Sequence, residues 1–320
     1  MEQMRARFAA VSAVVLLVSF GSFAQNPATP PSQPPGLSAI LSRVSEESAV
    51  FQQSIVKALT QETLEQRSWM PPSRFRPRVG QTAAEVPKPR LQTRVIVSEY
   101  SVGALKNSES RDLVEFRQVV SVDGVAIQSQ SSARHALSLG LQSRDDRVRK
   151  SMLEDFAKNG LVDIATDYGL ILLAFGKRGI ANMQFGEEAE RQFGAETVRS
   201  ITWKQLTSAG GELQFHGRQF SRLALSGRIL VRKSDFLPMM VETWAENVDN
   251  KQKIRDEAQV TYQMSEHGFL APISVAHRHI VNGAVLTENH YRYEPFKLFS
   301  ADAEITFTEL PGTPPPPVKK

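Results

Sequence analysis

Alternating apolar and polar residues dominate the chain beyond residue 91 and predict a fold rich in β-strands. Val114 and Phe116 flank Glu115, which is the two-residue period of a strand with one buried face. Asp123-Gly124 follows and suits a tight hairpin turn. Residues 197–307 add further strand-like segments separated by turn signals. We therefore expect an α+β fold, in which a curved antiparallel β-sheet (half-barrel or meander) is covered by helices.

Helical periodicity appears in two places. Residues 37–68 are predicted to form an N-terminal amphipathic helix, and residues 144–159 a central helix that ends near Gly160. The runs GLILLAF and GIANMQF, separated by GKRG, indicate a further hairpin over residues 168–185. The apolar stripe of the first helix consists of Leu37, Leu41, Val44, Phe51, Ile55 and Leu59.

The ends of the chain and one internal stretch have a different composition. Residues 1–24 resemble a secretory signal peptide cleaved near Ala24, with two arginines before a short apolar run. Residues 25–36 are a Pro-rich linker, residues 69–90 a basic Pro-rich loop, and residues 311–320 a disordered Pro/Lys tail. The β-rich domain is then expected over residues 91–310, and the protein is expected in the periplasm or outside the cell.

Composition excludes several chemistries. The absence of cysteine rules out disulfides, thiolate nucleophiles, thiolate metal ligands and a lipid-anchoring cysteine. The formal charge is +4 from 38 basic and 34 acidic residues, and loss of the leader's two arginines and one glutamate leaves +3. Such a small excess, without a basic stripe, argues against a nucleic-acid partner.

The basic Pro-rich loop admits two interpretations. It is either a solvent-exposed connection or a surface that contacts anionic lipid headgroups through clustered Arg and Lys side chains. The residues concerned are Arg74, Arg76, Arg78, Lys88 and Arg90.

The stretch HRHIVNGAVLTENH (residues 277–290) is the strongest candidate for metal chemistry. Asn282-Gly283 favours a two-residue type I′ turn, and that register places His277, His279, Glu288 and His290 on one face. Two histidines and a carboxylate suit zinc or non-haem iron. The alternative is a polar hairpin face without metal, which we favour because no supporting ligands can be identified. We therefore expect no metal, no cofactor and no catalytic residue.

Other motifs are weaker. Ser54-Ile55-Val56-Lys57 matches the S-x-x-K of penicillin-recognising enzymes, but the companion motifs are missing. The chain also lacks G-x-S-x-G, H-E-x-x-H and Walker A sequences.

The C-terminal part contains an ordered series of segments: GRILVRKSDFLPMMVETW, VTYQ, GFLAPISVAH, ENHYRYEPFKLF and ITF. With Asp235, Leu237, Pro238, Tyr262, Phe269, Pro272, Tyr291 and Tyr293 in matching order, the stretch from about Gly227 to Phe307 resembles the outer-membrane lipoprotein-sorting (LolA-like) proteins of Gram-negative bacteria. The resemblance implies a half-barrel covered by helices whose concave face shelters acyl chains, in the cell envelope, and it transfers no individual binding residue.

Three functional hypotheses remain open. The first is a non-catalytic carrier that binds a lipid or lipidated protein in an apolar cavity. The second is an envelope scaffold, which a cavity filled by the N-terminal helix would favour. The third is a metal-dependent enzyme, which converging side chains of the His-rich hairpin would favour. Oligomeric state is left open.

Overall fold

The computed structural model describes residues 35–72, 88–104, 113–143, 146–162, 167–207, 212–216 and 219–299. Side chains are described throughout these ranges except at residues 35, 143, 146–149, 212–216 and 219–223. The signal-peptide and C-terminal-tail predictions therefore lie outside the described residues. No helix in the described ranges combines the length and the apolar character needed to cross a bilayer.

The chain forms strands interrupted by a group of helices in its middle. The helices are α1 (Pro35–Ile55), α2 (Gln130–Ser143), α3 (Asp146–Lys158), the 3₁₀ helix η1 (Tyr168–Phe175) and α4 (Lys177–Ile180). The strands are β1 (Ala58–Met70), β2 (Arg90–Ala104), β3 (Leu113–Val122), β4 (Val125–Ala126), β5 (Met183–Glu187), β6 (Arg191–Phe193), β7 (Glu196–Gln205), β8 (Glu212–His216), β9 (Gln219–Leu223), β10 (Ser226–Arg232), β11 (Pro238–Asp249), β12 (Gln252–Met264), β13 (Leu270–Val281), β14 (Ala284–Tyr293) and β15 (Lys297–Leu298).

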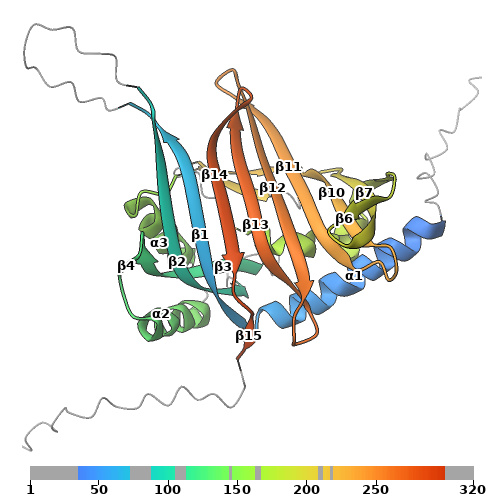
Figure 1. The fold of residues 1–320 in the computed structure, drawn as a ribbon, viewed down its shortest axis with the longest axis horizontal. Helices are drawn as coiled ribbons and strands as arrows, with labels where there is room; N and C mark the ends of the chain where they lie inside the picture. The colour runs from blue at the N-terminus through green and yellow to red at the C-terminus, as the bar shows by residue number, and fades with distance from the viewer. Residues whose placement is uncertain are drawn as a thin grey trace, which may run out of the picture. The chain divides into compact units, whose positions relative to one another are not determined.

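One large antiparallel sheet organises the protein. Within the described residues it has 13 strands in the order β4-β3-β2-β1-β14-β13-β12-β11-β10-β7-β5, with β15 and β6 pairing alongside β1 and β7. The sheet does not close, and β8 and β9 form a separate hairpin. Strand β1 lies between β2 and β14, so the first strand joins the C-terminal meander to β2 and β3 (Figure 1). The predicted α+β architecture with an antiparallel sheet and covering helices is confirmed.

Helices cover the face of the sheet that we call the inner face, which carries Leu64, Val260 and Tyr291. All three side chains are at most 2% exposed and belong to the same hydrophobic cluster as α1 and η1. The α1 residue Phe51 meets the β12 residue Tyr262 edge-on, with ring centroids 6.3 Å apart. The apolar stripe of α1 is thus buried against the sheet, as an amphipathic helix requires.

On the opposite, outer face, helix α2 covers the part near β2 and β3. The buried Phe116 and Leu137 pack together there, with the half-buried Leu59 beside them. Gly103 allows this close approach, because a Cβ atom at that position would lie 2.6 Å from the Leu141 side chain. Elsewhere the outer face carries a second buried apolar group, Val198, Leu230 and Met240, and the charged residues described below.

The predicted helix over residues 37–68 is wrong in its second half. Helix α1 ends at Ile55, and from Ala58 the buried positions recur every two residues, the period of a strand. Leu59 extended the apolar stripe by coincidence, since it belongs to the outer face. The decisive contacts are tertiary, because β1 forms hydrogen-bonded ladders with both β2 and β14.

Two other boundaries also differ. Residues 168–185 form η1, α4 and β5 instead of the predicted hairpin, and α2 was not anticipated. Helix α3 matches the predicted central helix closely, and Gly160 has the positive φ of 82° expected after its end. Pro35 and Gly36 of the predicted linker already belong to α1.

The predicted basic loop over residues 69–90 is partly strand. Trp69 and Met70 end β1, and Arg90 begins β2. Residues 73–87 lie outside the described residues, so the environment of Arg74, Arg76 and Arg78 stays a prediction. Lys88 and Arg90 are exposed.

Candidate functional site

The His-rich hairpin has the predicted turn but not the predicted register. Asn282 and Gly283 have φ values of 51° and 84°, as a type I′ turn requires. A β-bulge then shifts the pairing between His279 and Ile280, so that His277 faces Asn289 and His279 faces Thr287. One inserted residue moves every later side chain to the other face.

The bulge separates the four predicted ligands. His277 and His279 lie on the inner face and are 2% and 8% exposed. Glu288 and His290 lie on the outer face, where they approach to 3.4 Å. The grouping of these four residues on one face is therefore wrong. Within the described ranges, no three His, Asp or Glu side chains are arranged to hold a metal ion.

Asp256 of β12 is the acidic partner of the two histidines. Its Oδ1 atom lies 2.7 Å from Nδ1 of His279 and 3.3 Å from Nε2 of His277. Burial opposes the charge of Asp256, but the hydrogen bonds from both histidines outweigh it and hold the pKa of this carboxyl well below its usual range. Asp256 is therefore a buried carboxylate at neutral pH.

A directed chain of hydrogen bonds fixes the tautomer of His277. The backbone N–H of Val162 donates to Oε1 of Gln66 (2.9 Å), and Nε2 of Gln66 donates back to the Val162 carbonyl (2.7 Å). Because this clamp fixes the Gln66 amide, its Nε2 also donates to Oδ1 of Asn289 at 2.7 Å. Nδ2 of Asn289 then faces Nδ1 of His277 at 3.0 Å and donates to it. His277 accepts on Nδ1 and donates from Nε2 to Asp256, which describes a neutral imidazole.

This network, which we call the histidine network (Gln66, Asp256, His277, His279, Asn289), joins four strands to the segment after α3. Tyr168 at the start of η1 stacks on His277, with ring centroids 5.1 Å apart. The network thus ties the sheet to its inner cover.

Replacing His277 with alanine is expected to lower the free energy of unfolding by about 2–3 kcal/mol, because Asn289 and Asp256 lose a buried partner. His290→Ala is the matched control on the same hairpin, since the His290 side chain is 42% exposed. It should change stability by less than about 0.5 kcal/mol. Urea unfolding of both variants measures the difference, and equal losses would contradict the assigned register.

The low pKa of Asp256 predicts a loss of stability in acid. A carboxyl whose pKa is lower in the folded than in the unfolded chain stabilises the fold above the unfolded pKa, near 4. That contribution disappears as the pH falls through the folded pKa. Unfolding free energies between about pH 5 and pH 2 should therefore fall more steeply for the natural chain than for Asp256→Asn. Asp155→Asn, which changes a surface partner of Lys158, should keep the natural slope.

A second buried polar centre, the arginine centre, lies at Arg117 of β3. Its Nε and Nη2 atoms bind the two Glu62 oxygens at 2.7 and 2.8 Å, and Nη2 also binds Glu115 at 2.6 Å. The guanidinium lies over the rings of Tyr100 and Tyr291, 5.1 and 5.4 Å from their centroids. The centre holds two carboxylates and one guanidinium, all at most 3% exposed.

The arginine centre anchors the start of η1. The Glu115 N–H donates to the Asp167 carboxylate at 2.9 Å, and the Asp167 N–H donates to the Glu115 carboxylate at 2.8 Å. Gly169 packs against this pair so closely that a Cβ atom would lie 2.7 Å from Oε1 of Glu115. Burial raises the pKa of Glu62, although Arg117 opposes this effect.

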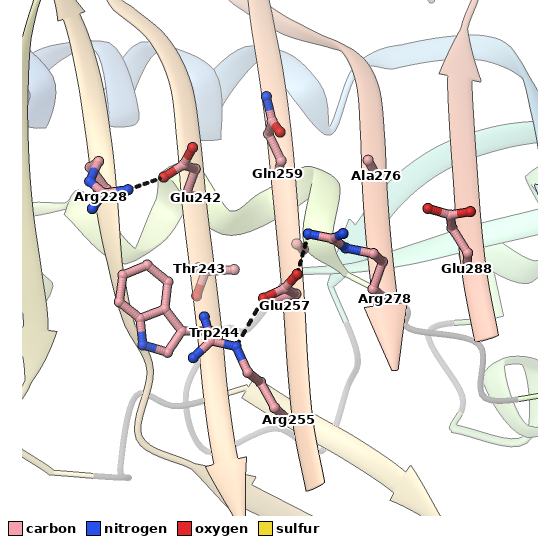
Figure 2. Close-up of a pocket in the computed structure, with 11 residues that line it drawn as sticks. Arg228, Glu242, Thr243, Trp244, Arg255, Glu257, Gln259, Ala276, Arg278 and Glu288 are labelled. Carbon is pink, nitrogen blue, oxygen red and sulfur yellow. Dashed lines mark hydrogen bonds and ion pairs between the residues drawn. The ribbon is translucent and has the colours of Figure 1, made fainter. Parts of the chain in front are cut away.

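The outer face carries a groove of about 430 Å³ crossed by charged residues of alternating sign. Arg67, Glu288, Arg278 and Glu257 face one another in sequence across β1, β14, β13 and β12. Figure 2 shows Arg278 reaching Glu257, and Arg228 reaching Glu242 at 2.8 Å. Opposite charges directly across strands stabilise this register, so we assign the groove a structural role.

Most members of these centres carry no recognisable sequence signal. Asp256 lies in the strand sequence KIRDEAQV and Arg117 in EFRQVV, where charged residues ordinarily alternate toward solvent. The only signal was excess polarity on both faces of a strand. Partners such as Gln66 and Asn289 are far apart in the chain and meet only through sheet pairing.

The architecture belongs to the class of open antiparallel sheets covered by helices. No protein-family model and no curated protein matches the chain. A putative outer membrane lipoprotein-sorting protein domain from Vibrio parahaemolyticus is 9% identical, with a TM-score of 0.35 over 84% of this chain and 95% of that one. A DUF1329 family protein from Desulfovibrio piger is 9% identical, with a TM-score of 0.35 over 84% of this chain and 97% of that one. A LolA superfamily protein from Nitrosomonas europaea is 10% identical, with a TM-score of 0.30 over 82% of this chain and 93% of that one.

The first and third of these structures carry the lipoprotein-sorting and LolA descriptions that the C-terminal sequence resembles. The TM-scores are too low for the likeness to support a functional argument. The proposals below depend on the geometry of this chain.

Proposed function

We propose that the protein is a non-catalytic binding module of the bacterial cell envelope that shelters an apolar ligand, a lipid or a lipidated protein, at the inner face of its sheet. The observation that carries the proposal is the nature of the inner cover. An apolar segment, YGLILLAF, lies against the sheet as η1, a 3₁₀ helix of 8 residues. Leu170, Leu172 and Phe175 of this segment are at most 5% exposed.

A 3₁₀ helix of this length is unusual, because runs beyond three or four residues have poor hydrogen-bond geometry. The residue that precedes it, Asp167, has a left-handed backbone with φ of 72°. We infer that η1 occupies the ligand's place in the free protein and withdraws when an acyl chain enters.

Tyr262 marks the middle of the contact between η1 and the sheet. Its hydroxyl accepts the Leu172 N–H at 3.2 Å and donates to the Gly169 carbonyl at 3.3 Å. If η1 is displaced on binding, the Tyr262 hydroxyl stabilises the free state more than the bound state. Ligands shift such an equilibrium only through differential affinity, so weakening the free state raises apparent affinity.

A scaffold protein without a small ligand is the second candidate. It is favoured by α1, whose stripe from Leu37 to Ile55 fills the inner face with side chains that are at most 4% exposed. In this alternative α1 and η1 are permanent parts of the core. Secretion into the periplasm is part of both proposals and depends on the leader sequence.

Native mass spectrometry of residues 25–320, purified from a periplasmic extract without detergent, tests the carrier proposal. A lipid-sized adduct that persists through purification supports it. A bare mass contradicts tight lipid binding and leaves the scaffold candidate ahead.

Tyr262→Phe is expected to raise the occupancy of that adduct severalfold, because a lost buried hydrogen bond is worth about 1 kcal/mol. Trp244→Phe is the matched control, since Trp244 lies on the outer face. Occupancy of a fluorescent fatty acid, titrated against the purified variants, gives a second measurement. Equal occupancy in both variants would show that η1 is not displaced.

A further inference from the structure

Three pairs of neighbouring strands end at the same end of the sheet, which we call the sheet tip. The β1–β2 ladder runs to Met70 and Arg90, the β11–β12 turn lies at Asn250-Lys251, and the β13–β14 turn at Asn282-Gly283. The last two turns are joined by hydrogen bonds of 2.8 and 2.9 Å between Lys253 and Asn282. In Figure 1 the corresponding strand ends lie at the upper end of the sheet.

Large apolar side chains are exposed at the sheet tip. Trp69 and Leu91 face each other across β1 and β2 and are 51% and 53% exposed. Val248 near the β11–β12 turn is 68% exposed, and Val285 near the β13–β14 turn is 39% exposed. Apolar residues grouped at the ends of three hairpins are more than the scattered exposure of ordinary surfaces.

Basic residues surround this apolar group. Lys88, Arg90, Lys251 and Lys253 are exposed, whereas Asp249 is the acidic residue at the β11–β12 turn. Within the described residues, none of the four basic side chains makes an ion pair. Their charge contrasts with the outer-face groove, where Arg228, Arg255 and Arg278 all have carboxylate partners.

We propose that the sheet tip docks on an anionic lipid bilayer, with Trp69 and Leu91 entering the headgroup region and the four basic residues contacting lipid phosphates. Tryptophan prefers this interfacial depth, and unpaired Lys and Arg are attracted to anionic headgroups. One apolar pair and four charges give reversible attachment, because each contributes modestly. The proposal deepens the proposed function and rests on it for its biological sense, since a lipid carrier must meet a membrane.

Vesicle co-sedimentation with the full mature chain tests the proposal. Vesicles of phosphatidylcholine with about one third phosphatidylglycerol should bind the protein, and pure phosphatidylcholine should bind it at least about tenfold more weakly. Raising NaCl from about 0.05 to 0.5 M should release it, because surface charges are then screened. Absence of binding to anionic vesicles, or equal binding to neutral ones, overturns the proposal.

Two pairs of substitutions locate the contact. Trp69→Ser with Leu91→Ser, and separately Lys88→Glu with Arg90→Glu, should each weaken binding about tenfold or more. The matched control is Met264→Ser with Ile273→Ser, which are 41% and 38% exposed at the opposite end of the strands. All changes are at exposed positions, and far-ultraviolet circular dichroism checks the fold. Retained binding in both tip variants overturns the proposal.

Quenching by brominated lipids reports which tryptophan enters the bilayer. Trp203 is 2% exposed and Trp244 is half-buried, so Trp69 should account for the quenching. Trp69→Phe should abolish quenching, and Trp244→Phe should preserve it. Quenching that survives in Trp69→Phe would place another part of the protein at the bilayer.

The result is separable from that of the carrier proposal. Tip variants should keep any lipid adduct seen by native mass spectrometry, since the substituted side chains are exposed and lie at the ends of the strands. Vesicle binding without an adduct supports docking and contradicts the carrier. An adduct without vesicle binding supports the carrier and contradicts docking.

Discussion

Replacing Arg117 with methionine is expected to lower the free energy of unfolding by about 3–5 kcal/mol. The guanidinium is the cation that pairs with Glu62 and Glu115, and all three side chains are at most 3% exposed. Methionine fills much of the volume but leaves two buried carboxylates without a counterion. An unpaired buried charge costs far more than a broken surface pair.

The loss of unfolding free energy in Arg117→Met should increase with pH. Without Arg117 the two carboxylates bind protons more readily in the folded chain than in the unfolded chain, so stability falls as the pH rises. The deficit of Arg117→Met should therefore be larger at pH 8 than at pH 5. Chemical unfolding at both values measures it.

Arg278→Met is the matched control for this experiment. Arg278 also pairs with a glutamate, Glu257, but its side chain is 51% exposed. Exposed ion pairs contribute about 0–1 kcal/mol, so Arg278→Met should hardly change the free energy of unfolding. A small, pH-independent loss for Arg117→Met would mean that the arginine centre is hydrated and that its anchoring of η1 is weak.

Replacing Phe51 with alanine should lower the free energy of unfolding by about 3–5 kcal/mol, the range for deleting a fully buried aromatic ring. Phe51 is 0% exposed and holds α1 against Tyr262 on the inner face. The adjacent Val50 is 41% exposed, so Val50→Ala should change stability by less than about 0.5 kcal/mol. Thermal and urea unfolding of this pair of variants provides the measurement.

Phe51→Ala also separates the two functional candidates. In a carrier the new cavity adjoins the ligand's place, and fluorescent fatty-acid binding should increase. In a scaffold with a permanent core, the variant loses stability and gains no binding. A stability loss as small as that of Val50→Ala would show that α1 is loosely attached.

The hairpin of residues 277–290 shows how far sequence reasoning reaches at the site. Asn282-Gly283 predicted the turn correctly, because positive φ at two successive positions is a local property. The faces of His277 and Glu288 were wrong, because a single bulge at His279/Ile280 reverses them. No local sequence pattern predicts this bulge.

The predicted helix over residues 37–68 was also correct only where local spacing decides the structure. The apolar stripe from Leu37 to Ile55 was predicted correctly, because the spacing of three and four residues between apolar positions can be read directly from the sequence. Beyond Ala58 the same chain becomes β1. Strand β1 forms hydrogen bonds with both of its neighbours, β2 and β14, and the spacing of apolar residues does not indicate this pairing.

Sequence patterns alone predicted the α+β class, the antiparallel meander of the C-terminal half, the lack of cysteine chemistry and the turns at Asp123-Gly124 and Asn282-Gly283. These features depend on local backbone preference and on the period of apolar residues. Three features became apparent only in the folded chain: His277 and His279 share Asp256, Arg117 lies between two glutamates, and η1 covers the inner face. Such pairings join residues distant in the chain, and their energies arise from burial and hydrogen-bond direction, which exist only once the sheet has formed.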